Sequence, residues 1–263
     1  MKASANKHKF EKKVVRKETR AYQEQLQTEI NQDREDHGKK PFPPDKFEKE
    51  EEKEIKESTT DSESDYYVKD ERTKQFAYSF HAASDRNGFI LGSIVTPGNV
   101  HDSQILEPLV KKVVDKVGKP AAVTADAGYK TPAIAKFLID NEMTPALPYT
   151  RPRTKEGFFR KQEYVYDEHC YLCPAGEVLK YSTTKKEGYR EYKSPKKICA
   201  TCPFLAQCTE SKDHQKVVTR HILQEYIEEA EHLRHHEEVK PIYAKRKETI
   251  ERVFADAKEK HGM

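Results

Sequence analysis

The 263-residue chain has no tryptophan, only three methionines, and no apolar run near the ~18 to 20 residues that would cross a bilayer. Only 35% of its residues are hydrophobic, while another 35% are charged. Residues 1–13 are charged and contain no apolar segment of the kind found in a secretory signal peptide. These absences exclude a membrane-spanning protein and indicate that part of the chain is solvated rather than core.

A strong charge of one sign is also missing, because 48 basic and 45 acidic residues leave a net charge of +3. A balanced chain has no global field that would favour nucleic acid. Residues 1–20 are an exception, with eight Lys or Arg against two Glu. Such a local basic face can contact phosphate, although a solvated helix surface explains it at least as well.

Cysteine is confined to residues 170–208, whereas a disulfide scaffold would spread it through an exported chain. Paired Cys-x-x-Cys motifs typically supply the four ligands of a structural zinc site. We therefore predict a zinc site at four cysteines with a fifth as spare ligand, and reduced thiols are the alternative. The four are Cys170, Cys173, Cys199 and Cys202, and the spare is Cys208.

The N-terminal part is predicted to be helical. Apolar residues recur at multiples of four over residues 4–37, and a second polar helix is expected over 47–56. The apolar stripe is too thin to form a core by itself. Residues 1–65 are therefore interpreted as a charged helical arm that leans on another part of the protein.

A compact core is expected over residues 66–150. Strands are predicted at 75–83 and 89–96 around an Asp85-to-Gly88 turn, followed by a helix that Asp102 or Ser103 can cap. Apolar strands at 121–125 and 144–148 flank a further helix. This order predicts an α/β fold whose sheet has mixed strand direction. Residues 151–240 read as an insertion, loop-like to about 215, and 241–263 as a C-terminal helix.

Two carboxylates stand out in this pattern. Asp126 follows a short apolar strand, and the carboxyl ends of strands collect ligand and catalytic groups. A carboxylate there can hold Mg²⁺, although a turn or N-cap aspartate is an equal alternative. Glu251 lies on a predicted helix spanning 243–258, between Ile250 and an apolar Val-Phe pair. Without further context, a plain surface glutamate is the simpler interpretation.

At these residues the sequence resembles a known family. The segments "TPGNVHDS" and "VTADAGYKTP", followed by the pattern YxxR…ExxxxxxK around Glu251, are similar to the catalytic core of bacterial insertion-sequence DDE transposases. The resemblance implies an RNase H-like fold and Mg²⁺-dependent cleavage and strand transfer of DNA. The gap between Arg246 and Glu251 is four residues, where the commonest form of the signature has three.

The resemblance also assigns residues. Asp126 corresponds to the second catalytic aspartate and Glu251 to the glutamate, and both would bind one or both of two Mg²⁺ ions. Tyr243, Arg246 and Lys258 match the other signature positions, and the basic pair would contact DNA phosphates. The implied partners are the terminal inverted repeats and target DNA, and the implied location is the bacterial cytoplasm at the nucleoid. A homodimer is left open.

The first catalytic aspartate of the family has no match, because no apolar strand ending in Asp precedes residue 66. The expectation is a chain truncated just past that residue and inactive by itself. Asp102 has a secondary active-site role as the alternative to its capping role. A non-catalytic DNA-binding remnant and another RNase H-like nuclease are the alternative functions.

Overall fold

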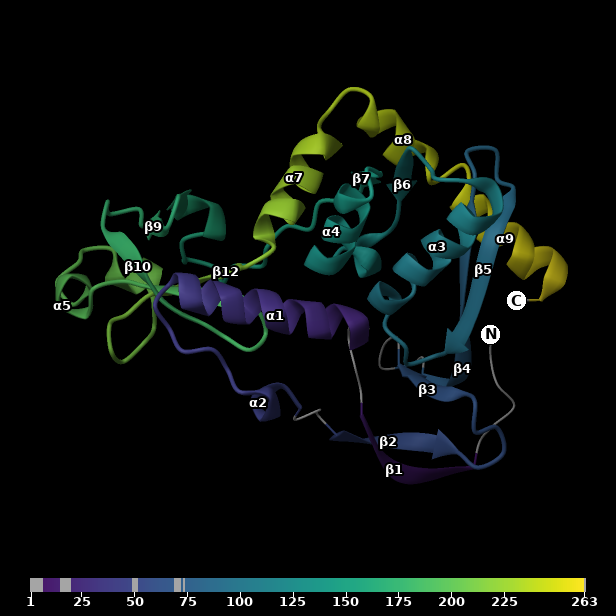
Figure 1. Ribbon diagram of the computed structural model, residues 1–263, viewed down its shortest axis with the longest axis horizontal. Helices are drawn as coiled ribbons and strands as arrows, with labels where there is room; N and C mark the ends of the chain where they lie inside the picture. The colour runs from purple at the N-terminus through teal and green to yellow at the C-terminus, as the bar shows by residue number, and fades with distance from the viewer. Residues whose placement is uncertain (1–6, 15–19, 49–51, 69–71, 73, 263) are drawn as a thin grey trace. The chain divides into compact units, whose positions relative to one another are not determined.

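The computed structural model describes residues 7–14, 20–48, 52–68, 72 and 74–262 (Figure 1). The chain divides into two compact units. The first spans 1–22, 49–149 and 226–263, and the second spans 23–48 and 150–225. Each unit therefore combines segments that lie far apart in the sequence.

The first unit contains a five-stranded antiparallel sheet in the order β1-β2-β3-β4-β5. Its strands are β1 (His8–Val14), β2 (Glu52–Ser58), β3 (Asp65–Val68), β4 (Lys74–Ser84) and β5 (Ile90–Pro97). The predicted hairpin is confirmed, because β4 and β5 pair around a turn in which the Asp85 carboxylate accepts the backbone N–H of Asn87 at 2.8 Å. Gly88 has a φ of 88°, which glycine adopts without steric cost.

A parallel pair of short strands, β6 (Ala122–Thr124) and β7 (Thr144–Ala146), forms a separate sheet. Helix α4 (Pro132–Asp140) packs on β7. Helix α3 (Leu106–Val117) packs on α4 and on the β4–β5 hairpin (Figure 1). Their apolar faces meet in one core, made of Leu106, Val110, Ala125, Ile134, Leu138, Met143 and Leu147. The α/β class is therefore confirmed. The strand directions are mixed, but the described strands lie in separate sheets rather than one.

Two N-terminal expectations are wrong. Residues 8–14 form strand β1 rather than helix, and they pair antiparallel with β2, where the second helix was expected to end. Among the described residues of that second stretch, helix is confined to the end of α2 (Pro44–Glu48). The pairing joins residues about 44 positions apart, so local periodicity carries no signal for it.

The second unit holds most of α1 (Arg20–Asp36), α2 and a sheet that sequence reasoning missed. Residues 151–215 were expected to be loops, but they supply most of a five-stranded antiparallel sheet in the order β12-β11-β10-β9-β8. Its strands are β8 (Val165–Asp167), β9 (Cys170–Leu172), β10 (Val178–Thr184), β11 (Tyr189–Lys193) and β12 (Val217–His221). Three tyrosines form most of its buried core, so the aromatic residues that suggested loops are packed inside: Tyr164, Tyr171 and Tyr192.

The C-terminal region consists of α7 (Gln224–Arg234), α8 (Val239–Lys245) and α9 (Ile250–His261). A single helix over 243–258 is therefore wrong. The Thr249 hydroxyl donates to the carbonyl of Lys245 at 3.0 Å, and such side-chain bonds compete with helix propagation. No helix in the described ranges is both long and apolar enough to cross a membrane.

The buried His221 predicts acid sensitivity in the second unit. Burial, together with the charge of Arg190, lowers its pKa from 6.5 to about 4. The folded state therefore binds the proton more weakly than the unfolded state, and stability is full above pH 6.5 and falls as the pH drops toward 4. Between pH 7.5 and 5 the loss is expected to be about 2 kcal/mol, measured by urea unfolding.

The matched variant is His221→Asn, whose side-chain oxygen can still accept the Leu223 backbone N–H that His221 Nδ1 accepts at 3.1 Å. This variant should lose most of the extra pH dependence over the same interval. An unchanged slope in the variant would contradict the assignment to His221.

Candidate active site

Asp126 lies directly after β6 and begins the short 3-10 helix η2 (Ala127–Tyr129). Its side chain is exposed, and Oδ1 accepts the Gly128 backbone N–H at 2.9 Å. The N-cap alternative is thus confirmed as its local role. The cap occupies one carboxylate oxygen, so the same side chain can still offer Oδ2 to a ligand.

Gly128 brings two carboxylates together. A Cβ at this position would lie 2.8 Å from Asp102 Oδ2 and 3.2 Å from Asp126 Oδ1. Only glycine leaves room for both oxygens without displacing one of them. The glycine in the Asp-Ala-Gly-Tyr motif therefore permits the close approach of Asp102 to Asp126.

The capping role expected for Asp102 is wrong. His101 is the N-cap of the 3-10 helix η1 (Asp102–Gln104), and its ring Nδ1 accepts the Ser103 backbone N–H at 3.2 Å. Since the imidazole takes this donor, the Asp102 carboxylate is free to turn toward β4. There its Oδ1 lies 3.9 Å from His81 Nδ1.

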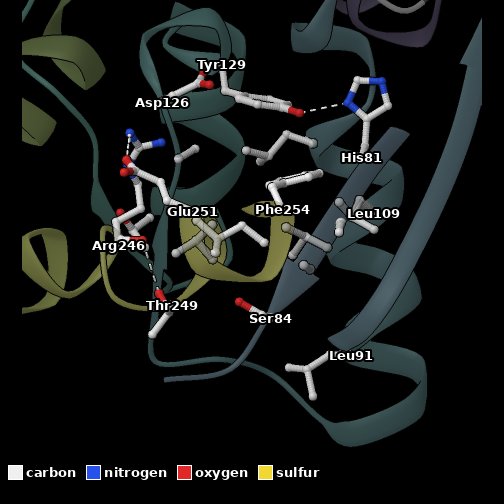
Figure 2. Close-up of a pocket in the computed structure, with 18 of the residues that line it drawn as sticks. His81, Ser84, Leu91, Leu109, Asp126, Tyr129, Arg246, Thr249, Glu251 and Phe254 are labelled. Carbon is white, nitrogen blue, oxygen red and sulfur yellow. Dashed lines mark hydrogen bonds and ion pairs between the residues drawn. The ribbon is translucent and has the colours of Figure 1, made fainter. Parts of the chain in front are cut away.

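His81 and Tyr129 belong to the same site and were missed in the sequence. The His81 side chain is 3% exposed, and its Nδ1 lies 2.8 Å from the Tyr129 hydroxyl (Figure 2). Its Nε2 lies 3.2 Å from Thr96 Oγ1 on the paired strand β5. The available signal was one histidine within a strand that also carries three aromatic residues, which a satisfied core histidine would give as well.

Burial and mutual charge shift the titration of this group. Burial lowers the pKa of His81 below its usual 6.5, although Asp102 and Asp126 oppose that shift. Burial raises the pKa of Asp102, and the nearby Asp126 charge adds to the increase while His81 opposes it. Burial and the two carboxylates also raise the pKa of Tyr129. At neutral pH the histidine is neutral and the Tyr129 hydroxyl is protonated.

Glu251 stands in the first turn of α9 and forms an ion pair with Arg246, whose Nη2 lies 2.9 Å from Glu251 Oε1 (Figure 2). The helix is held against β4 by Phe254, which packs edge-to-face on Phe80 at a centroid distance of 6.3 Å. The Glu251 side chain is 48% exposed. Glu251 is therefore more than an isolated surface side chain, because its ion pair with Arg246 fixes the orientation of its carboxylate.

A cavity of about 1250 Å³ joins these elements (Figure 2). It is lined by residues of β4, α3, β6 and α9, and Asp126, Arg246 and Glu251 are all among them. Two other signature residues lie outside its lining: Tyr243 is half-buried on α8, and Lys258 is exposed on α9. The structure thus brings three of the five expected active-site residues to one cavity, together with Asp102 and His81.

The structure groups a different set of four cysteines from the set that the sequence predicted. Cys173, Cys199, Cys202 and Cys208 line one small cavity in the second unit, and Cys170 is not among its lining residues. All five thiols are free and half-buried. In the described part of the chain, no three His, Cys, Asp or Glu side chains are arranged as a ready metal site.

Comparison with known families adds one finding. Residues 172–263 match the family model described as the transposase DDE domain. This part of the chain is therefore similar to the transposase DDE domain. The matched part contains Arg246, Glu251 and Lys258, whereas Asp126 precedes it.

The DDE transposase match also covers the cysteine-bearing sheet from Leu172 onward. Four of the five cysteines therefore lie within the matched residues, and Cys170 lies outside them. No curated protein and no solved structure matches the chain significantly. The similarity to a known family consequently covers the C-terminal 92 residues.

Proposed function

We propose that this chain supplies the catalytic part of a DNA transposase, which cuts and joins phosphodiester bonds at the ends of a mobile element. The observation that supports the proposal is the shared cavity of Asp126, Arg246 and Glu251. Two of these residues belong to the transposase DDE domain match, and Asp126 comes from a different segment. A coincidental surface glutamate would have no reason to face that aspartate across one cavity.

The carboxylates fit Mg²⁺, a hard ion that prefers oxygen ligands. Asp126 Oδ1 accepts Gly128 N–H, and Glu251 Oε1 accepts Arg246, so each residue has a second oxygen to offer. We infer that these two residues hold Mg²⁺. An ion held by these two carboxylates would supply activation of the attacking hydroxyl and charge stabilisation for the leaving oxygen on phosphorus.

The other residues of the cavity have supporting roles. Arg246 fixes the Glu251 carboxylate and can also meet a DNA phosphate, because guanidinium groups bind phosphate oxygens well. Lys258 and Tyr243 are proposed to contact DNA outside the cavity. The buried His81 and the half-buried Tyr129 support Asp102 beside Asp126.

The cavity is also lined by two strands that do not pair with each other in the described part of the chain. Within the described residues, β4 pairs with β5 along Tyr78–Ser84 and β6 pairs with β7, while no pairing joins β4 to β6. Both strands line the cavity, and the buried Thr124 hydroxyl on β6 lacks a hydrogen-bond partner in the described part. An added strand could pair with such edges. We propose that a third carboxylate reaches Asp126 on a strand of this kind.

The chain is expected to bind DNA that carries the ends of its element, yet to give no strand transfer with Mg²⁺, because two carboxylates hold the metal more weakly than three. A gel assay on end-containing DNA measures both properties. Extension of the chain at its N-terminus by a designed apolar strand ending in Asp should produce cleavage and strand transfer. The control is the same extension with that Asp changed to Asn.

Three outcomes separate the alternatives. Mg²⁺-dependent strand transfer by the unextended chain would contradict the incomplete site. DNA binding without cleavage in the extended chain would favour a non-catalytic DNA-binding remnant. Cleavage without preference for the element ends would favour another nuclease of RNase H-like fold.

A further inference from the structure

We propose that the cavity-lining cysteines of the second unit, Cys173, Cys199, Cys202 and Cys208, bind one structural zinc ion, and that Cys170 has no part in it. The proposal is independent of catalysis at Asp126. It begins from the small cavity of about 20 Å³ that these four side chains line. That volume is about the space of one water-sized sphere, so a single ion fits it without opening the fold.

The two Cys-x-x-Cys motifs differ because they lie on different secondary structures. Cys199 ends the helical turn α5 (Lys196–Cys199), and the Cys202 N–H donates to the Cys199 carbonyl at 3.1 Å. Residues three apart on a helical turn share one side, so both thiols can approach one ion. This motif therefore has the geometry of a chelating pair.

The first motif has no such geometry. Cys170 begins β9, and successive side chains of a strand point to opposite faces, so residues three apart point away from each other. Cys173 packs on the buried tyrosine core, which is also the side to which Tyr171 points. The Cys170 thiol instead donates to the Asp167 carbonyl at 3.5 Å. The sequence pattern alone suggested a pair that the strand separates.

Cys208 replaces Cys170 as the fourth ligand. It ends the short helix α6 (Leu205–Cys208), packs on the same tyrosine core as Cys173, and interacts electrostatically with both Cys173 and Cys199. Its sulfur lies 3.2 Å from the Tyr164 hydroxyl. Four thiolates around one small cavity are the ligand set that Zn²⁺ takes in closed structural sites. The sulfurs are not yet at coordination spacing, so metal binding must draw them inward.

The segment that carries α5 and α6 has little structure of its own to stabilise it. Helices α5 and α6 have only four residues each, and helices of that length are not stable by themselves. They lie between β11 and β12, and the buried core beneath consists of five residues. A zinc ion would link the segment between β11 and β12 to the β9–β10 hairpin, as metals do in small domains with small cores.

The test measures metal content of the full chain purified under reducing conditions without chelator. About one zinc per chain is expected in the wild type and in Cys170→Ser. Cys208→Ser should weaken zinc binding at least ~10-fold, since even residues behind a metal ligand cost that much. Equal loss in both variants, or retention in Cys208→Ser, would overturn the ligand set.

A second measurement needs no variant. In the zinc-loaded wild type, a thiol reagent should modify Cys170 quickly and the other four cysteines slowly, and a chelator should expose all five. Co²⁺ substituted for zinc should give the absorption of a tetrahedral thiolate site. A zinc ratio near zero after refolding with added Zn²⁺, or five thiols of equal reactivity with zinc present, would refute the proposal.

Discussion

Asp126→Asn is expected to lower Mg²⁺-dependent DNA cleavage at least ~10³-fold in the chain extended to a complete carboxylate set. Metal stabilisation of the reacting phosphate contributes several kcal/mol, and each 1.4 kcal/mol is a factor of ten in rate. The asparagine oxygen can still accept the Gly128 N–H that Asp126 Oδ1 accepts at 2.9 Å. The substitution therefore removes the negative charge and keeps the local cap.

The control is Asp140→Asn, because Asp140 lies on α4 in an exposed i,i+4 ion pair with Lys136. Its cleavage rate should stay within about twofold of wild type, as expected for an exposed pair. Single-turnover cleavage, with melting temperature measured alongside, separates chemistry from folding. Full activity in Asp126→Asn would show that Asp126 only caps η2.

Asp33→Ala is expected to destabilise the second unit by about 3 to 5 kcal/mol, the cost of leaving one partner of a buried ion pair uncompensated. The Asp33 side chain is 6% exposed and lies 2.5 Å from Arg190 Nη2. It also accepts Arg190 Nε at 2.7 Å and the hydroxyl of Thr184. These bonds connect α1 to strands β10 and β11.

Asp36→Asn is the matched control on the same helix, because Asp36 accepts an exposed hydrogen bond from Gln32 at 2.9 Å. It should change stability by less than ~0.5 kcal/mol. Urea unfolding followed by circular dichroism measures both variants. Adding Arg190→Met to Asp33→Ala should recover much of the loss, since the unpaired charge is then gone. A cost below about 1 kcal/mol for Asp33→Ala would contradict the buried pair.

Local sequence signals predicted the elements that need no distant partner. The β4–β5 hairpin follows from its Asn-Gly turn, and α4 follows from Thr131 as N-cap with Pro132 at the first helical position. The α3 helix follows from apolar spacing, although its cap was assigned wrongly. These features depend on interactions within a few residues, so a single sequence is enough to predict them.

Most of the sequence predictions that are wrong have one physical cause, which is strand pairing between residues far apart in the chain. Strand β1 is stabilised by β2, and the sheet of the second unit is stabilised by tyrosines that meet only after the strands align. The helix break before α9 is the local exception, because there the Thr249 hydroxyl donates to the carbonyl of Lys245. Composition in these stretches is charged and aromatic, and it is compatible with loops or helices until the partner strands are known.

By itself, the sequence determined the α/β class of the core, the hairpin and the identity of Asp126 and Glu251 as the residues to examine. Only the tertiary structure decided that these two share a cavity with Asp102, and that Asp33 joins α1 to the cysteine-bearing sheet. It also decided which cysteines line one cavity, because a strand turns Cys170 away while a helical turn keeps Cys199 and Cys202 on one side. Side-chain direction depends on backbone conformation, and the backbone of this region is set by partners far along the chain.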